Sequence, residues 1–211
     1  MKLVDAPYFG SQDVRILDTT VCHHGHLRVE KLQLSCRLFQ GGWSSPFYRE
    51  VLKREQGVGV LPYDPLQDKV LMVEQFRVGC LDDPRNGPWA LELIAGLRDT
   101  GEAIDELVRR EALEEAGLAL GELIPVASYY NSPGGSSEQL EVFCAGFDAD
   151  HGTGIFGLAH EAENIRSRVL DREAALAAVA SGRINNAMSI IALQWLQLNL
   201  QKVRKRLMGD E

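Results

Sequence analysis

The stretch that decides the fold is Gly96-Leu-Arg-Asp-Thr-Gly-Glu102-Ala-Ile-Asp-Glu-Leu-Val-Arg-Arg110-Glu111-Ala-Leu-Glu114-Glu115-Ala-Gly117-Leu118. Within it, residues 104–116 have helical periodicity, because Ile104, Leu107 and Val108 fall on one apolar stripe. We expect Gly117 to end this helix, since glycine adopts the left-handed backbone of a helix C-cap at little cost. The segment therefore predicts a loop followed by an amphipathic helix.

The glutamates of this helix do not follow the usual pattern. At roughly 100° per residue, Glu111 and Glu115 project in nearly the same direction as the apolar stripe. A Glu-rich helix ordinarily carries its acids on a solvated face opposite that stripe. Glu114 lies only about 100° from Glu115, so the acids share one broad face. Because Mg²⁺ prefers oxygen ligands, carboxylates grouped at one helix end predict a divalent-cation site.

The composition of the whole chain limits the classes of function. Its 211 residues fit one domain, or a core domain with a small extra sheet, and 45% hydrophobic residues can bury a core. The formal net charge of −8 argues against a nucleic-acid partner, which requires a basic surface. No stretch approaches the roughly eighteen apolar residues of a membrane span. We therefore expect neither nucleic-acid nor membrane binding.

The cysteines and the N-terminus point to a reducing compartment. Cys22, Cys36, Cys80 and Cys144 are widely spaced with no CxxC pair, which favours reduced, packed thiols over zinc ligands or disulfides. Residues 1–7 contain no apolar core of signal-peptide length. A cytoplasmic location is the expectation.

Residues 1–55 are expected to form a small antiparallel sheet. Strict alternation of apolar residues over 32–38 predicts a half-buried strand, and residues 14–17 and 48–53 are predicted to lie beside it. Gly41-Gly42 is the expected turn between strands. We predict that this region takes part in forming a dimer.

Residues 56–211 are expected to form the catalytic domain, with a mixed α/β pattern in which helices flank a sheet. Beyond the central helix, a short helix is expected to open at Asp171 and end at Gly182, and a long amphipathic helix should run from 187 to 207. Trp89 and Trp195 are most simply core or interface aromatics. The predicted strands are 58–62, 69–77, 89–94, 124–130 and 140–147.

The chain resembles the Nudix family at the stretch quoted first. Glycine, five residues, glutamate, seven residues and then Arg-Glu-x-x-Glu-Glu-x-Gly plus an apolar residue is the Nudix box. A small departure is Ala112, at a position that is usually aliphatic. The resemblance implies the Nudix fold, a mixed β-sheet sandwiched between helices. The matching residues are Gly96, Glu102, Arg110, Glu111, Glu114, Glu115, Gly117 and Leu118.

Motifs outside the box resemble the bacterial ADP-ribose pyrophosphatase branch of that family. Before the box stand Arg49-Glu50, Arg54 and Glu74-Gln75-Phe76-Arg77. After it come Ser132-Pro133-Gly134-Gly135-Ser136-Ser137-Glu138 and the acidic segment Gly157–Ile165. The resemblance covers nearly the whole chain and is weakest before Arg49.

The resemblance implies a metal-dependent catalytic site. It implies two or three Mg²⁺ ions, with Mn²⁺ as a substitute. Arg110 would orient the acids by charge-assisted hydrogen bonds, and Glu102 and Glu114 would lie beside the ligands. Glu161 matches the general base of the family, with a box glutamate as the alternative, and the preceding Gly152, Gly154 and Gly157 favour a loop that moves on substrate binding. The implied metal ligands are Glu111, Glu115, Glu163 and the carbonyl of Ala95.

The resemblance also implies substrate contacts. Arg54 and Arg77 would hold phosphates or the terminal ribose, Arg49-Glu50 would contact the base, and Leu97 would contribute its backbone. A loop reaching across from the second subunit of a homodimer would complete a shared active site. Where the family often has aromatic residues against adenine, this chain has His26-Leu27. The loop residues are Ser132, Pro133, Gly134 and Glu138.

The expected activity is Mg²⁺-dependent hydrolysis of the diphosphate bond of ADP-ribose to AMP and ribose 5-phosphate. One alternative is the same chemistry on another nucleoside diphosphate sugar, such as GDP-mannose. The other is a sensor that binds ADP-ribose without cleaving it. Such sensors commonly lose acids of the box, all of which this chain keeps.

Overall fold

The computed structural model describes residues 8–98 and 100–209. The N-terminal segment 1–7 and Asp99 of the box, about which the sequence made predictions, lie outside the described residues. The chain divides into two compact units. The first runs up to Glu55 and includes Tyr130–Glu138, and the second comprises Gln56–Tyr129 and Gln139–Glu211.

The first unit is built on a three-stranded antiparallel sheet in the order β1-β2-β3. The strands are β1 (Val14–His24), β2 (Arg28–Cys36) and β3 (Phe47–Lys53), and a 3₁₀ turn, Ser11–Asp13, precedes β1. Gly41 and Gly42, with φ of 93° and 79°, make the predicted turn before β3. Strand β1 continues to His24, beyond the predicted 14–17, and every residue of it is exposed. Strand β2 begins and ends four and two residues earlier than the predicted 32–38.

The second unit contains a mixed sheet in the order β10-β11-β5-β4-β9-β8, with β6 paired to β5 and β7 to β4. The β4–β9 pair is parallel, whereas β4–β5 and β5–β11 are antiparallel. A mixed sheet is the class of sheet that the sequence predicted for this region. Its strands are β4 (Gly57–Asp64), β5 (Lys69–Phe76), β6 (Trp89–Glu92), β7 (Ile94–Leu97), β8 (Leu123–Tyr130), β9 (Gln139–Gly146), β10 (Gly154–Phe156) and β11 (Ile165–Asp171).

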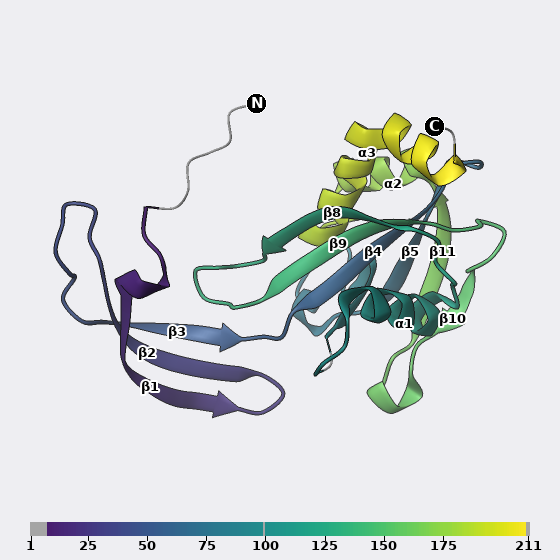
Figure 1. Ribbon diagram of the computed structural model, residues 1–211. Coiled ribbons are helices and arrows are strands. Elements are labelled where there is room, and N and C mark those ends of the chain that lie inside the picture. The colour runs from purple at the N-terminus through teal and green to yellow at the C-terminus, as the bar shows by residue number, and fades with distance from the viewer. Residues whose placement is uncertain (1–7, 99, 210–211) are drawn as a thin grey trace. The chain divides into compact units, whose positions relative to one another are not determined.

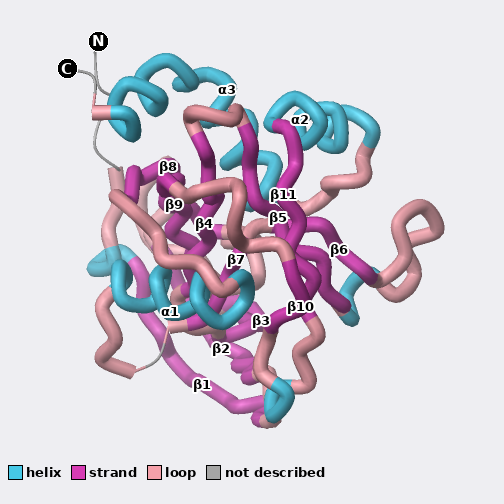
Figure 2. The backbone as a smooth tube through the Cα atoms, turned by 90° about the vertical axis from the view of Figure 1, so that its right-hand side faces the viewer, coloured by secondary structure: helices cyan, strands magenta, loops and turns pink. Residues whose placement is uncertain are grey.

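Helices cover both faces of this sheet. Figures 1 and 2 show α1 (Ile104–Ala116) on one face and α2 (Arg172–Ser181) with α3 (Ala187–Met208) on the other. Short 3₁₀ turns follow β5 (Val78–Cys80) and precede β11 (Ala159–Glu161). Each long helix ends on a left-handed glycine, including the predicted Gly117 and Gly182. No helix among the described residues is long and apolar enough to cross a membrane.

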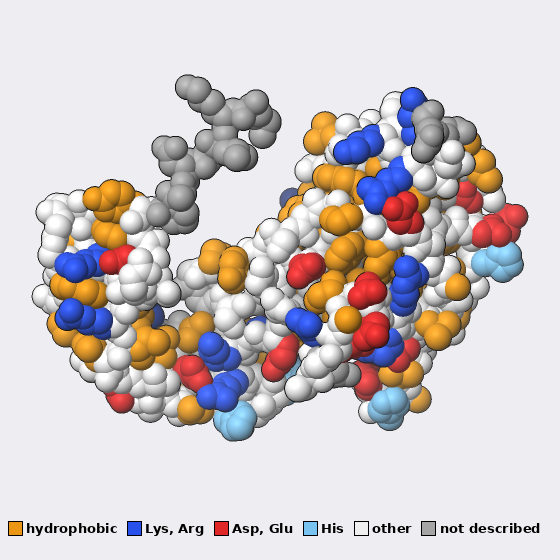
Figure 3. Space-filling view, viewed as in Figure 1, with side chains coloured by type: hydrophobic (Ala, Val, Ile, Leu, Met, Phe, Trp, Pro, Cys, Tyr) orange, Lys and Arg blue, Asp and Glu red, His pale blue; other side chains and the backbone are white. Residues whose placement is uncertain are grey.

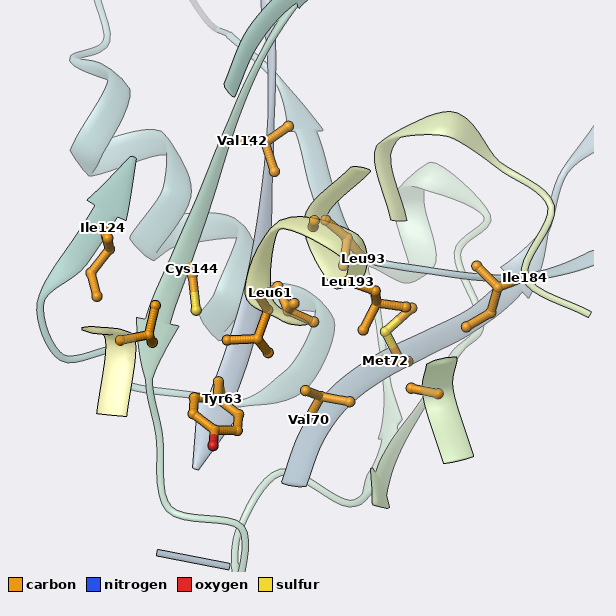
Figure 4. Close-up of a cluster of buried hydrophobic side chains, with 14 of the residues drawn as sticks. Leu61, Tyr63, Val70, Met72, Leu93, Ile124, Val142, Cys144, Ile184 and Leu193 are labelled. Atoms are coloured by element: carbon orange, nitrogen blue, oxygen red, sulfur yellow. The ribbon is translucent and has the colours of Figure 1, made fainter. Parts of the chain in front are cut away.

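Alternation along the strands creates two hydrophobic cores. On β5, Val70 and Met72 pack toward α2 and α3, whereas Leu71 and Val73 pack toward α1. Figure 4 shows the first of these cores, in which Tyr63 and Leu61 of β4 meet Leu193 of α3. Because a strand presents successive side chains to opposite faces, one residue can serve α1 while its neighbour serves the other side. This alternation determines where polar residues of β5 lie.

Two features of the sheet differ from the sequence prediction. The single strand expected over 89–94 is two strands, because the chain leaves β5 at Leu93, whose N–H donates to Ser189 Oγ of α3 (3.0 Å), and then pairs with β4. Strands β10 and β11 were not predicted. Arginines alternate with buried residues in β11, a pattern that its pairing with β5 explains.

Candidate active site

The glutamates of α1 lie on the face that packs against the sheet. Glu115 is only 2% exposed and is buried together with Leu107, Val108 and Ala112 of the same helix. The side chain of Glu111 is 13% exposed and that of Glu114 is 26% exposed. Figure 3 shows acidic and basic side chains gathered over this part of the molecule. Two acids therefore continue the apolar stripe, as the helical periodicity predicts.

Gly96 of β7 makes room for Glu111. A Cβ at position 96 would lie 1.8 Å from Oε1 of Glu111 and 2.0 Å from its carboxylate carbon, far inside van der Waals contact. The first glycine of the box is therefore explained by the close approach of a carboxylate to the backbone, because glycine alone has no Cβ.

Glu115 is held by two donors from the sheet. The backbone N–H of Ala95 donates to its Oε2 (3.0 Å), and Gln75 Nε2 donates to its Oε1 (3.2 Å). Burial, with a further contribution from Glu111, raises the pKa of Glu115 to about 8. Burial likewise raises the pKa of Glu111 to about 7, aided by Glu114 and Glu163 and opposed by Arg110. Two partly desolvated acids that repel each other favour a bound cation.

Arg110 ties together the other acids of the box. Its Nε and Nη2 donate to the two oxygens of Glu102 (2.9 and 3.1 Å), a bidentate arrangement. Its Nη1 donates to Glu111 Oε1 (2.9 Å) and Glu114 Oε2 (3.0 Å). These carboxylates raise the pKa of Arg110, with Glu102 contributing most. Arg110 thus fixes the orientation of the acids with which the sequence associated it.

Gln75 and Glu92 belong to the site although sequence reasoning assigned them no role. Gln75 is 5% exposed and contacts Glu115, whereas Glu92 is 8% exposed and accepts a hydrogen bond from Arg77 Nε (2.6 Å). Burial raises the pKa of Glu92, and Arg77 partly opposes this. The available signal for Gln75 was its place in the quoted motif Glu74-Gln75-Phe76-Arg77, two residues after the apolar run Val70–Val73. Arg77 remains 43% exposed, which leaves donors free for a ligand.

The acidic loop after β10 lies against the end of α1. The N–H of Gly157 donates to the carbonyl of Glu114 (3.1 Å), and Glu163 Oε2 accepts from the N–H of Leu158 (3.1 Å). The Glu161 side chain is 55% exposed and lies 3.5 Å from His160 Nε2. Of the glycines expected to make the loop mobile, Gly154 is part of β10, whereas Gly157 has a φ of 98° beside the loop.

The predicted metal ligands are only partly brought together. Glu111 and Glu115 are close enough to perturb each other, and Glu163 acts electrostatically on Glu111. Among residues 8–98 and 100–209, no three His, Cys, Asp or Glu side chains are gathered in an arrangement ready for a metal ion. Arg110, Gln75 and the backbone of Leu158 hold these carboxylates instead.

The remaining predicted substrate residues, apart from Leu97 on β7, lie in the first unit. Arg54 Nε is 3.6 Å from Glu138 Oε1, and the Arg54 N–H donates to Ser137 Oγ (2.9 Å). Ser132 begins a tight turn, since its carbonyl accepts from Gly135 N (3.1 Å). The loop carrying Ser132, Pro133, Gly134 and Glu138 therefore lies beside Arg54 of its own chain. On the same sheet, Arg49 and Glu50 are in β3 and His26-Leu27 is in the β1–β2 turn.

Comparison with known proteins identifies the family of the chain. Residues 53–188 match the NUDIX domain, so the chain belongs to the Nudix family. It is 41% identical over 196 residues to the ADP-ribose pyrophosphatase of Escherichia coli (strain K12), covering 93% of each chain. It is also 34% identical over 149 residues to the GDP-mannose pyrophosphatase of Salmonella paratyphi B, covering 71% of this chain and 77% of the relative.

A solved structure described as an ADP compounds hydrolase shares the fold. It superposes with a TM-score of 0.69 at 18% identity, covering 92% of this chain and 98% of its own. The predicted Nudix fold is confirmed, and so is the predicted similarity to bacterial ADP-ribose pyrophosphatases.

Proposed function

We propose that this protein hydrolyses the diphosphate bond of ADP-ribose to give AMP and ribose 5-phosphate. The observation that carries the proposal is the placement of Glu111 and Glu115 against β7 within a complete Nudix box. The 41% identity to an ADP-ribose pyrophosphatase, over 93% of both chains, supports the choice of substrate. The acids support the proposed class of reaction, and the similarity to the relatives supports the proposed substrate.

The reaction is proposed to depend on Mg²⁺, with Mn²⁺ as a substitute and two or three ions in the site. Glu111, Glu115, Glu163 and the backbone of Ala95 would hold the ions, since all offer the oxygen ligands that Mg²⁺ prefers. The fit is supported by the clearance that Gly96 gives the Glu111 carboxylate. Bound Mg²⁺ supplies charge neutralisation at the diphosphate and lowers the pKa of water.

The protein's own residues position the acids and move a proton. Arg110 keeps Glu111 and Glu114 oriented, and Gln75 and the Ala95 N–H orient Glu115. Glu161 is proposed as the general base, because its side chain is exposed and can reach a water near the substrate. Arg77, held by Glu92, is proposed to bind a phosphate, and Leu97 to offer its backbone.

The first unit is proposed to bind the nucleoside and the terminal ribose. Arg54, steadied by Glu138, would bind phosphate or ribose, and Arg49-Glu50 and His26-Leu27 would approach the base. We propose a homodimer in which the loop with Ser132, Pro133 and Gly134 completes the active site of the other subunit. Apolar side chains on β1 that are about half or more exposed, such as Ile16 (64%) and Leu17 (51%), support a sheet that a second copy covers. A cytoplasmic location is part of the same proposal.

A second candidate is hydrolysis of another nucleotide sugar such as GDP-mannose. The 34% identity to a GDP-mannose pyrophosphatase favours this candidate, although that relative matches only 71% of this chain. The two candidates share the acids and differ in the contacts with the base. Because the chemistry is common to both, the products discriminate between them.

Product analysis tests the proposal. The protein is incubated with Mg²⁺ and, separately, with ADP-ribose, GDP-mannose and other nucleotide sugars, and the products are identified by chromatography. AMP and ribose 5-phosphate, formed fastest from ADP-ribose and abolished by EDTA, are the expected result. Faster turnover of GDP-mannose would establish the second candidate. Tight binding of ADP-ribose without turnover of any compound would instead indicate a sensor.

A further inference from the structure

A cluster of arginines surrounds Glu74 of β5. Arg166 Nη2 lies 2.5 Å from Glu74 Oε2, Arg168 Nη1 lies 3.8 Å from the same oxygen, and Arg183 donates to Oε1. Arg166 and Arg168 come from β11, and Arg183 comes from the segment that joins α2 to α3. Segments far apart in the sequence therefore bring three guanidinium groups to one carboxylate.

The cluster lies on the face of the sheet opposite the box glutamates. In the strand register of β5 and β11, Glu74 lies opposite Arg166 and Met72 lies opposite Arg168. Met72 packs into the core beneath α2 and α3. The next residue, Gln75, points the other way and contacts Glu115. Figure 2 shows β11, β5 and β6 side by side in this part of the sheet. The cluster is therefore a different surface from the candidate active site.

The charges of the cluster do not balance. Among the described residues, Glu74 is the only acid ion-paired with these three arginines, so three positive charges face one negative charge. The arginine side chains are 55%, 38% and 31% exposed, which leaves N–H donors accessible to a ligand. Guanidinium groups held this close repel one another unless an anion joins them. Paired arginines also match the geometry of a phosphate.

Two exposed aromatic rings adjoin the arginines. Phe76 is two residues after Glu74 on β5 and so shares its face, and Trp89 is its register partner on β6. The rings are 50% and 55% exposed and lie edge to face, with centroids 5.9 Å apart. The carbonyl of Trp89 accepts a hydrogen bond from Arg183 Nη1 (3.2 Å), which joins the two groups. Trp89 is therefore exposed rather than buried in the core, which leaves the interface role of the two that the sequence suggested.

We propose that the Glu74 arginine cluster (Arg166, Arg168 and Arg183), together with Phe76 and Trp89, is a second binding site for a nucleoside monophosphate. The arginines bind the phosphate, and an aromatic ring stacks on the base. The site needs no metal ion and does not depend on the proposed hydrolysis. Its ligand class includes AMP, a product of that hydrolysis.

Calorimetry with AMP, inorganic phosphate and adenosine tests the site in the presence of EDTA. The wild-type protein should bind AMP more tightly than either fragment. The double variant Arg166→Gln/Arg168→Gln should lose about tenfold or more of the AMP affinity. The control Lys202→Gln/Lys205→Gln removes the same charge from exposed positions of α3 and should bind AMP as the wild type does. Glu111→Gln should also retain this binding, because it changes only the candidate active site.

A second variant is expected to bind AMP more tightly instead of more weakly. Glu74→Gln removes the competing carboxylate and should tighten AMP binding by about fivefold, an effect that loss of structure would not produce. Circular dichroism and thermal unfolding establish that each variant is folded. Absence of AMP binding by the wild type, or unchanged binding by Arg166→Gln/Arg168→Gln, would overturn the proposal. Equal affinity for inorganic phosphate and AMP would overturn the role of the aromatic pair.

Discussion

The carboxylate of Glu111 lies so close to Gly96 that a single methyl group at position 96 would occupy its place, 1.8 Å from Oε1. The clash would involve the flexible end of a side chain rather than the backbone. Gly96→Ala should therefore fold normally, with a loss of stability of about 1 kcal/mol or less, yet displace Glu111. A displacement of this size is expected to lower kcat by up to about 100-fold.

The matched control for Gly96→Ala is Gly79→Ala. A Cβ at position 79 meets nothing within 4 Å and requires no unusual backbone, so this variant should keep wild-type activity. Thermal unfolding and steady-state kinetics are measured on both variants. Full activity of Gly96→Ala would show that the position of Glu111 does not matter to the reaction.

Gln75 is expected to act as a positioning residue for Glu115. Replacing it with leucine removes the 3.2 Å hydrogen bond while keeping a similar volume, so Glu115 loses one of its two described donors. Loss of a residue that orients a metal ligand typically costs about 10–100-fold in metal affinity or activity. Mn²⁺ binding is measured by calorimetry, with Gln201→Leu on the exposed side of α3 as the control. If Gln75→Leu binds Mn²⁺ normally and kcat is unchanged, Gln75 has only a packing role.

The variant Glu161→Gln tests whether Glu161 acts as the general base rather than as a metal ligand. A general base contributes about 10²–10⁴-fold, so kcat should fall by orders of magnitude while Mn²⁺ affinity stays near that of the wild type. The control is Glu173→Gln, whose side chain is 84% exposed on α2. If activity survives in Glu161→Gln, the base is elsewhere, with a glutamate of the box as the first alternative.

Asp68 should make the stability of the second unit depend on pH. Arg172 donates to both of its oxygens (2.9 and 3.0 Å), and Arg204 lies 2.8 Å from Oδ1. The hydrogen bonds from Arg172, with smaller contributions from Tyr63 and Arg204, lower the pKa of Asp68. A lowered pKa in the folded state means that the stabilisation is present above the unfolded value of about 4 and is lost as pH falls through the folded value.

Urea unfolding checks this dependence. At pH 7, Asp68→Asn should lose about 1–2 kcal/mol, a figure reduced because the Asp68 side chain is 33% exposed and solvent screens the pair. The difference between the two proteins should shrink as pH is lowered below about 4. A difference that stays constant from pH 7 to pH 3 would mean that the charge of Asp68 is not what stabilises the fold.

Local sequence signals predicted the helices of the fold closely. The bounds of α1 agree with the predicted 104–116, because a 3.6-residue period and the terminal Gly117 both act within the segment itself. The same holds for Gly182, which ends α2. Where a helix end depends on its own residues, the sequence is sufficient.

Contacts between residues far apart in the sequence could not be predicted from local patterns. Gln75 and Glu115 are 40 positions apart, so nothing near either residue indicates their hydrogen bond. Strand β11 was missed because its arginines are explained by Glu74, 92 positions from Arg166. The close approach of Glu111 to Gly96 is likewise a product of tertiary packing, although the box pattern marked both residues.

The buried acids of α1 are central to the proposed reaction. The direct test is kcat for ADP-ribose with Mg²⁺ in Glu115→Gln, compared with Asp105→Asn, which changes an exposed acid on the same helix. Glu115→Gln is expected to lose at least about 100-fold in kcat and to bind Mn²⁺ more weakly, since removing a metal ligand removes charge stabilisation. Asp105→Asn should match the wild type. A Glu115→Gln protein with wild-type kcat and Mn²⁺ affinity would mean that the buried acids of α1 do not carry the reaction.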